Sequence, residues 1–106
     1  MITFKEAEMR SKVIKAFAHP TRIMMIEFLG KGEKSFSEIF KLFDLDKSTV
    51  SKHLLVLKDA GILNSKKNGW DMLYTLEIPC ITEFFGCVTT VLEHNKKKKS
   101  NCLCKR

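Results

Sequence analysis

A mainly helical fold with one small β-hairpin is predicted by three features of the sequence. Apolar residues recur with a helical period up to about residue 60, and the pattern then changes to that of extended chain. Asn68-Gly69, where the segments ILNSKKN and WDMLYTLE meet, is the strongest short hairpin signal. A length of 106 residues, of which 44% are hydrophobic, suits one domain with a single core. We expect a folded domain over residues 1–95 and a flexible, basic, cysteine-containing tail over residues 96–106.

The helices are delimited by their capping residues. TFKE at residues 3–6 and SFSE at residues 35–38 are capping boxes, which start the first helix and a short third one. Pro20 fits the first position of the second helix, PTRIMMIEFL. Asp46 is the expected N-cap of a fourth helix, and a last helix is expected over about residues 80–94. The core residues expected on the second and third helices are Ile23, Met25, Ile26, Leu29, Ile39, Phe40 and Phe43.

The net charge of +7 is concentrated in two places. Residues 93–106 hold six basic residues and one acidic residue, whereas the rest of the chain holds thirteen basic and eleven acidic ones. Such a basic end is usually only a solvated tail. Within the folded part, a second basic cluster consists of Lys47, Lys52, Lys58, Lys66 and Lys67, against Asp59. This local cluster is the better indication of a nucleic-acid partner.

The sequence indicates a cytoplasmic protein that does not associate with membranes. Its start, MITFKEAEMRSK, lacks the apolar stretch of a signal peptide. No apolar run approaches the roughly 18 residues that span a bilayer. In the cytoplasm the four cysteines are expected to be thiols or metal ligands rather than a disulfide framework.

The segment KSTVSKHLLVLKDAGIL, residues 47–63, combines an apolar stripe with an unusual polar face. Val50, Leu54 and Leu57 share one side of the helix, and short hydroxyl side chains with lysines lie on the other. Ser and Thr near a helix start often only cap it, but lysines on both this helix and the following hairpin favour DNA. The element order is that of a winged helix-turn-helix, whose second helix enters the major groove. The candidate contacts to double-stranded operator DNA are Lys47, Ser48, Thr49, Ser51, Lys52, Lys66 and Lys67.

Two motifs in this order and spacing, AFAHPTRIMMIEFL and LDKSTVSKHLLVLKDAGIL, resemble the ArsR/SmtB family of winged-helix repressors. The resemblance covers residues 5–93. It implies a homodimer whose interface is formed by the first and last helices, and an effector that is a metal, a metalloid or the redox state. His53 matches a position that is commonly His in the family. Because it lies at the edge of the apolar stripe, we expect a packed, hydrogen-bonded histidine rather than a ligand.

The family's common Cys-Val-Cys metal motif would fall at Ser35 and Ser37, so we expect no metal site there. The remaining candidate ligands are Cys80, Cys87, Cys102 and Cys104. A purely packing role for Cys80 and Cys87 is the alternative, since free cysteines often pack as small apolar residues. These two are seven residues apart, about 10.5 Å along a helix, so one helix alone does not close a site. Either the tail cysteines or a second protomer must complete it.

An all-sulfur site favours soft ions, namely arsenite, Cd, Pb, Zn or Cu(I). We therefore expect a repressor that requires no cofactor and that leaves its operator on binding such an ion. A thiol-based redox sensor is the alternative effector mechanism, and a basic nucleic-acid-binding protein without an inducer is the alternative function. No Ser-His-acid or paired-carboxylate constellation is visible, so an enzyme is not expected.

Overall fold

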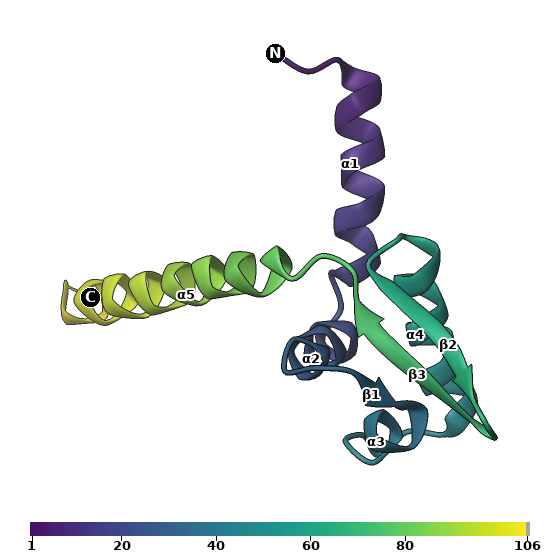
Figure 1. Ribbon diagram of the computed structural model, residues 1–106. Helices are drawn as coiled ribbons and strands as arrows, with labels where there is room; N and C mark the ends of the chain where they lie inside the picture. The colour runs from purple at the N-terminus through teal and green to yellow at the C-terminus, as the bar shows by residue number, and fades with distance from the viewer. Residues whose placement is uncertain (106) are drawn as a thin grey trace.

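The computed structural model describes the backbone of residues 1–105 and the side chains of residues 1–97. A small body of helices and sheet carries two projecting helices, α1 and α5, which leave it in different directions (Figure 1). The mainly helical class with a small antiparallel sheet is confirmed. The elements are α1 (Phe4–Phe17), α2 (Pro20–Leu29), β1 (Lys34–Ser35), α3 (Phe36–Phe40), α4 (Lys47–Asp59), β2 (Leu63–Asn68), β3 (Asp71–Leu76) and α5 (Cys80–Lys105).

The helices begin where the capping residues predicted. Thr3 Oγ1 accepts a hydrogen bond from the backbone N–H of Glu6 at 3.1 Å, and Pro20 occupies the first turn of α2. Ser35 and Glu38 form a reciprocal capping box at the start of α3. Each of these bonds satisfies a backbone group that a helix end otherwise leaves without a partner.

The core lies between α2, α4, the sheet and the first turns of α5. The predicted stripe of α4 is confirmed, since Val50, Leu54 and Leu57 are almost completely buried. Of the seven core residues expected on α2 and α3, four are fully buried and three are only partly buried. The buried residues are Ala16, Phe17, Met25, Ile26, Leu29, Ile39, Val50, Leu54, Leu57, Ile62, Leu63, Ile81 and Phe85.

The three-stranded sheet has the order β1-β3-β2, with antiparallel neighbours. The β2–β3 hairpin was predicted, and its register pairs Asn68 with Asp71. Its turn residues are therefore Gly69 and Trp70, and Gly69 has the positive φ of 63° that a two-residue hairpin turn requires at this position. Strand β1 was not predicted, because two residues carry no periodicity; Lys34 pairs with Tyr74 on the outer edge of β3.

Helix α5 differs from the sequence-based expectation in its length. The prediction that the last helix ends near residue 94 is wrong, because α5 continues to Lys105. The sequence after Gly86 contains neither glycine nor proline, and lysine is a good helix former. The flexibility of residues 96–106 remains a prediction. No helix in the described part of the chain has the length and apolar character needed to cross a membrane.

Candidate nucleic-acid interface

The outer face of α4 presents short polar side chains and one lysine. Ser48, Ser51 and Lys52 are exposed, Thr49 is half-buried, and the opposite face of the helix packs into the core. The inner side of α4 contacts α2. The chain enters α4 from α3 through the short segment 41–46, so α3 and α4 form the helix-turn-helix pair. The geometry leaves the amino-terminal half of α4 open to a partner.

Asp46 organises the hydroxyl groups at the start of α4. Ser48 Oγ donates a hydrogen bond to Asp46 Oδ2 at 2.6 Å, and Thr49 Oγ1 donates to Asp46 Oδ1. These two hydroxyls are the main cause that lowers the pKa of the Asp46 carboxyl, which therefore stays ionised. Because both hydroxyl protons point to Asp46, Ser48 and Thr49 present oxygen acceptors to a ligand. Asp46 occupies the predicted N-cap position, but its side chain makes no capping hydrogen bond to the backbone. Its carboxylate instead accepts from the two hydroxyls, which was not foreseen.

The lysines predicted to contact DNA lie in different environments. Lys47 Nζ lies 5.9 Å from the centroid of the Phe40 ring. On β2, Lys66 Nζ lies 3.5 Å from Glu33 Oε2, in a largely exposed ion pair. Lys52 and Lys67 are exposed. Lys47 thus begins α4 with its ammonium group near the Phe40 ring, whereas Lys66 and Lys67 are neighbours on strand β2.

Trp70 at the hairpin tip was missed as a candidate. It is the only tryptophan of the chain, and its side chain is fully exposed. The position of a tryptophan directly after Asn68-Gly69 and two lysines was the available indication. An exposed aromatic ring beside basic residues provides an additional surface for a nucleic acid.

The prediction of a packed, hydrogen-bonded His53 is confirmed. Arg22 Nε donates to His53 Nδ1 at 3.0 Å, and the His19 ring lies 4.6 Å from the His53 ring between centroids. Burial, followed by the nearby His19 and Arg22, lowers the pKa of His53 from its ordinary value of 6.5. His53 is therefore neutral at physiological pH.

Ser35 and Ser37 both take structural roles. Ser35 caps α3, and Ser37 Oγ donates to Asp71 Oδ2 at 2.7 Å, which ties α3 to the start of β3. This bond is the main cause that lowers the pKa of Asp71. Hydroxyls do not supply the soft thiolate ligands of the family's motif at these positions.

Cys80 and Cys87 are both exposed on α5, so neither packs in the core of the protomer. The side chains of Cys102 and Cys104 lie outside the described residues. Within residues 1–97, no three or more His, Cys, Asp or Glu side chains gather in a group that could hold a metal ion. The described part of one protomer therefore provides two accessible thiols on one helix.

The comparisons with known proteins agree with this architecture. The family model described as "Bacterial regulatory protein, arsR family" matches residues 19–65. The HTH-type transcriptional regulator Rv0081 of Mycobacterium tuberculosis is 30% identical over 86 residues, covering 80% of this chain and 75% of that protein. Its crystal structure has a TM-score of 0.79 at 26% identity and covers 92% of this chain and 98% of that chain.

Two further proteins are similar. The biofilm growth-associated repressor of Xylella fastidiosa is 31% identical over 94 residues, which are 89% of this chain and 82% of that protein. The homodimeric winged helix-turn-helix domain Mb0332 of Mycobacterium bovis shares the fold, with a TM-score of 0.73 at 21% identity, over 92% of this chain and 93% of that chain. The fold, the polar face of α4 and these relatives define the protein as a DNA-binding transcriptional repressor rather than an enzyme. The chain belongs to the arsR family of winged-helix regulators.

Proposed function

We propose that the protein is a cytoplasmic, homodimeric repressor that leaves its operator when a thiophilic metalloid or metal ion binds its cysteines. The observation that carries this proposal is the exposure of both Cys80 and Cys87 on α5. A packing role inside the protomer does not explain two exposed thiols. Exposed thiols in a reducing compartment are reactive groups that a soft ion can bind.

Apolar surface on the projecting helices supports the homodimer. Exposed large apolar side chains include Phe4 and Ile14 on α1, and Phe84, Val91 and Leu92 on α5. Such a concentration on two helices that leave the body is typical of an interaction surface. We infer that a second copy of the chain covers it, as an isologous interface permits.

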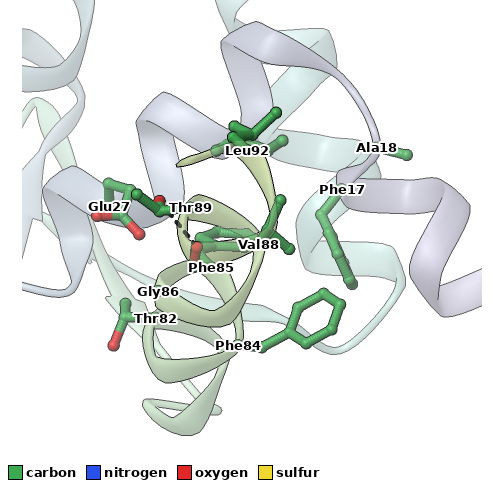
Figure 2. A pocket seen from close by; sticks show the side chains of 11 residues that line it. Phe17, Ala18, Glu27, Thr82, Phe84, Phe85, Gly86, Val88, Thr89 and Leu92 are labelled. Carbon is green, nitrogen blue, oxygen red and sulfur yellow. Dashed lines mark hydrogen bonds between the residues drawn. The ribbon is translucent and has the colours of Figure 1, made fainter. Parts of the chain in front are cut away.

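An apolar cavity of about 570 Å³ adjoins the same surface, between the end of α1, α2 and α5 (Figure 2). Phe17 forms edge-to-face contacts with Phe84 and Phe85 at centroid distances of 6.2 Å and 5.7 Å. Phe84, Val88 and Leu92 line the cavity from α5. Covering it would add apolar burial to the proposed dimer interface.

The proposed ion site uses thiols from two protomers or from the tail. Cys80 and Cys87 are separated by about 10.5 Å of helix rise, whereas thiolates that share one ion lie within roughly 4 Å. Antiparallel α5 helices that cross near Glu83 and Phe84 would bring Cys80 of one protomer to Cys87 of the other. On an α5 that runs to Lys105, Cys102 lies about 22 Å of helix rise beyond Cys87, so Cys102 or Cys104 would become ligands only if the last turns of α5 unwind. The suitable ions are arsenite, Cd, Pb, Zn and Cu(I), and no further cofactor is required.

The DNA surface in this proposal consists of the seven polar residues on α4 and β2. The α4 side chains read base edges in the major groove, and the hairpin lysines lie along the neighbouring phosphates. A two-fold dimer then binds an inverted repeat whose half-site centres are about 34 Å apart. Ion binding acts on this surface only if the ion prefers the DNA-free conformation, and a preference of about 2.7 kcal/mol lowers operator affinity roughly a hundredfold.

The test is a titration of reduced protein with arsenite and with Cd. Thiolate charge-transfer absorbance and affinity for a duplex selected from a random pool are read in parallel. Wild type should bind the ion and release the duplex, whereas Cys87→Ser should do neither. Thr90→Ser, an exposed hydroxyl on the same helix, is the control and should behave as wild type.

Other results of the titration would identify a different ion site or a different effector. If Cys87→Ser still binds the ion and releases DNA, the site lies elsewhere. If the double variant Cys102→Ser and Cys104→Ser responds normally, the site is the Cys80–Cys87 pair between protomers. If wild type ignores thiophilic ions but releases DNA after peroxide, the protein is a redox sensor, and if neither acts, it binds DNA without an inducer.

A further inference from the structure

The Arg22 side chain joins three helices behind the DNA-binding face. Its Nη1 donates to the backbone oxygen of Ala16 near the end of α1 at 3.0 Å, and its Nε donates to His53 Nδ1 on α4 at 3.0 Å. Arg22 itself belongs to α2. One half-buried guanidinium therefore connects a projecting helix to the helix that carries the DNA-reading side chains.

The protonation state of His53 decides whether this connection exists. A guanidinium has only donors, so His53 must supply a bare Nδ1 and carry its hydrogen on Nε2. His19 has the same arrangement, since its Nδ1 accepts from the backbone N–H of Thr21 at 3.1 Å. A proton on His53 Nδ1 would face the N–H of Arg22 and remove the bond.

We propose that Arg22 is a positioning residue for α4, and that operator binding requires the neutral form of His53. This inference rests on the DNA-binding role of the family and is independent of the proposed ion site. The link fixes the direction of α4 relative to α1 and α2, because the charged guanidinium of Arg22 donates one hydrogen bond to α4 and one to α1. Such bonds are stronger than those between neutral groups.

The surroundings of His53 make its protonation costly in the folded protein. Burial is the main cause that lowers the pKa of His53, followed by His19 at the N-cap of α2 and Arg22 on α2 itself. Helix α1 contributes the neutral carbonyl of Ala16, which already accepts a hydrogen bond from Arg22 Nη1. An imidazolium at position 53 would thus lie between two basic groups, and separation of α4 from Arg22 would relieve the repulsion.

The expected pH dependence is opposite to the usual trend. DNA is a polyanion, so protonation of histidines near it ordinarily strengthens binding. Here acid should weaken it, because the proton disrupts the support of α4. Between about pH 7.5 and pH 5.0 we expect roughly a tenfold loss of operator affinity, equivalent to about 1.4 kcal/mol.

The experiment measures affinity for the selected duplex at both pH values and fixed ionic strength, with circular dichroism to confirm that the protein stays folded. His53→Asn keeps an amide oxygen that accepts from Arg22 but does not titrate, and should bind at neutral pH while losing the acid sensitivity. Arg22→Lys, which keeps the charge but cannot bridge Ala16 and His53, should bind about tenfold more weakly at neutral pH and show little further loss in acid. His94→Asn on α5 is the control and should retain the wild-type profile.

Nitrogen NMR of the wild-type imidazole provides a readout that does not depend on a variant folding. Nδ1 of His53 should be unprotonated at neutral pH and should titrate below 6.5. A protonated Nδ1 at neutral pH would show that the link is absent. Wild-type binding that strengthens steadily in acid, or a His53→Asn profile that falls as wild type does, would also overturn the proposal.

Discussion

The two hairpin lysines, adjacent in sequence, should contribute unequally to DNA binding. Lys66 lies 3.5 Å from Glu33, whereas Lys67 is exposed on the same strand. An ion pair at the surface is weak, but its carboxylate offsets part of the positive charge that a phosphate would meet. Lys67→Ala should therefore weaken binding to every sequence, and Lys66→Ala should weaken it less.

The magnitude follows from counterion release. One lost phosphate contact reduces the slope of log affinity against log salt by about 0.9. Affinity falls for both proteins when the salt concentration rises fourfold. The fold-loss for Lys67→Ala should be about 3.5 times smaller than the fold-loss for wild type. Glu33→Gln is the matched variant, which frees Lys66 and should raise affinity and steepen the slope.

The assay is fluorescence anisotropy with operator and random duplexes over a series of salt concentrations. Both duplexes should respond to Lys67→Ala alike, because phosphate contacts carry no sequence information. A wild-type slope for Lys67→Ala would show that Lys67 makes no phosphate contact. Weaker binding by Glu33→Gln would contradict the role given to Glu33, since its carboxylate would then support the DNA-bound hairpin rather than oppose DNA binding.

Three further predictions concern specificity, the missing motif and pH. Lys52→Ala should reduce the preference for operator over random duplex by about 1–3 kcal/mol if Lys52 contacts a base edge. An equal loss of affinity for both duplexes would show that Lys52 contacts only the DNA phosphate backbone. Changing Ser35 and Ser37 to Ala should leave the ion response intact while lowering the unfolding free energy by about 1 kcal/mol through the lost Ser35 cap and by about 1 kcal/mol more through the lost bond from Ser37 to Asp71, as measured by urea denaturation. Because the fold lowers the pKa of His53 below 6.5, the unfolded chain binds the proton more readily, so stability should fall as pH drops through 6.5; a constant urea midpoint there would contradict this.

Local chemistry made much of the fold predictable from the sequence. Residues such as Thr3, Pro20 and Ser35 determine, to within one helical turn, where helices begin. Each signal lies within four or five consecutive residues. The apolar stripe of α4 is equally local, because a single helix repeat defines its buried side. These features were confirmed.

What could not be predicted depends on contacts between distant segments. Strand β1 exists because Lys34 and Ser35 reach the edge of β3, about forty residues away, and no pattern in two residues indicates this. The bond from Arg22 to His53 spans 31 residues. The hydrogen bonds of Ser48 and Thr49 to Asp46 are local, but the sequence equally allows Asp46 to cap backbone N–H groups instead. The predicted DNA residues lie on α4 and β2, and Cys80 and Cys87 lie on α5, as the sequence indicated. The side chains of Cys102 and Cys104, which were expected in the tail, lie outside the described residues.

The most direct test of the DNA-binding surface is to map amide chemical-shift changes when the selected operator duplex is added to the reduced protein. The largest changes should fall on residues 47–52 of α4 and on residues 66–70 of the hairpin. Smaller changes should follow at the Arg22 link behind α4. Changes confined to α1 and α5, with α4 and the hairpin unaffected, would contradict the assignment of this face to DNA.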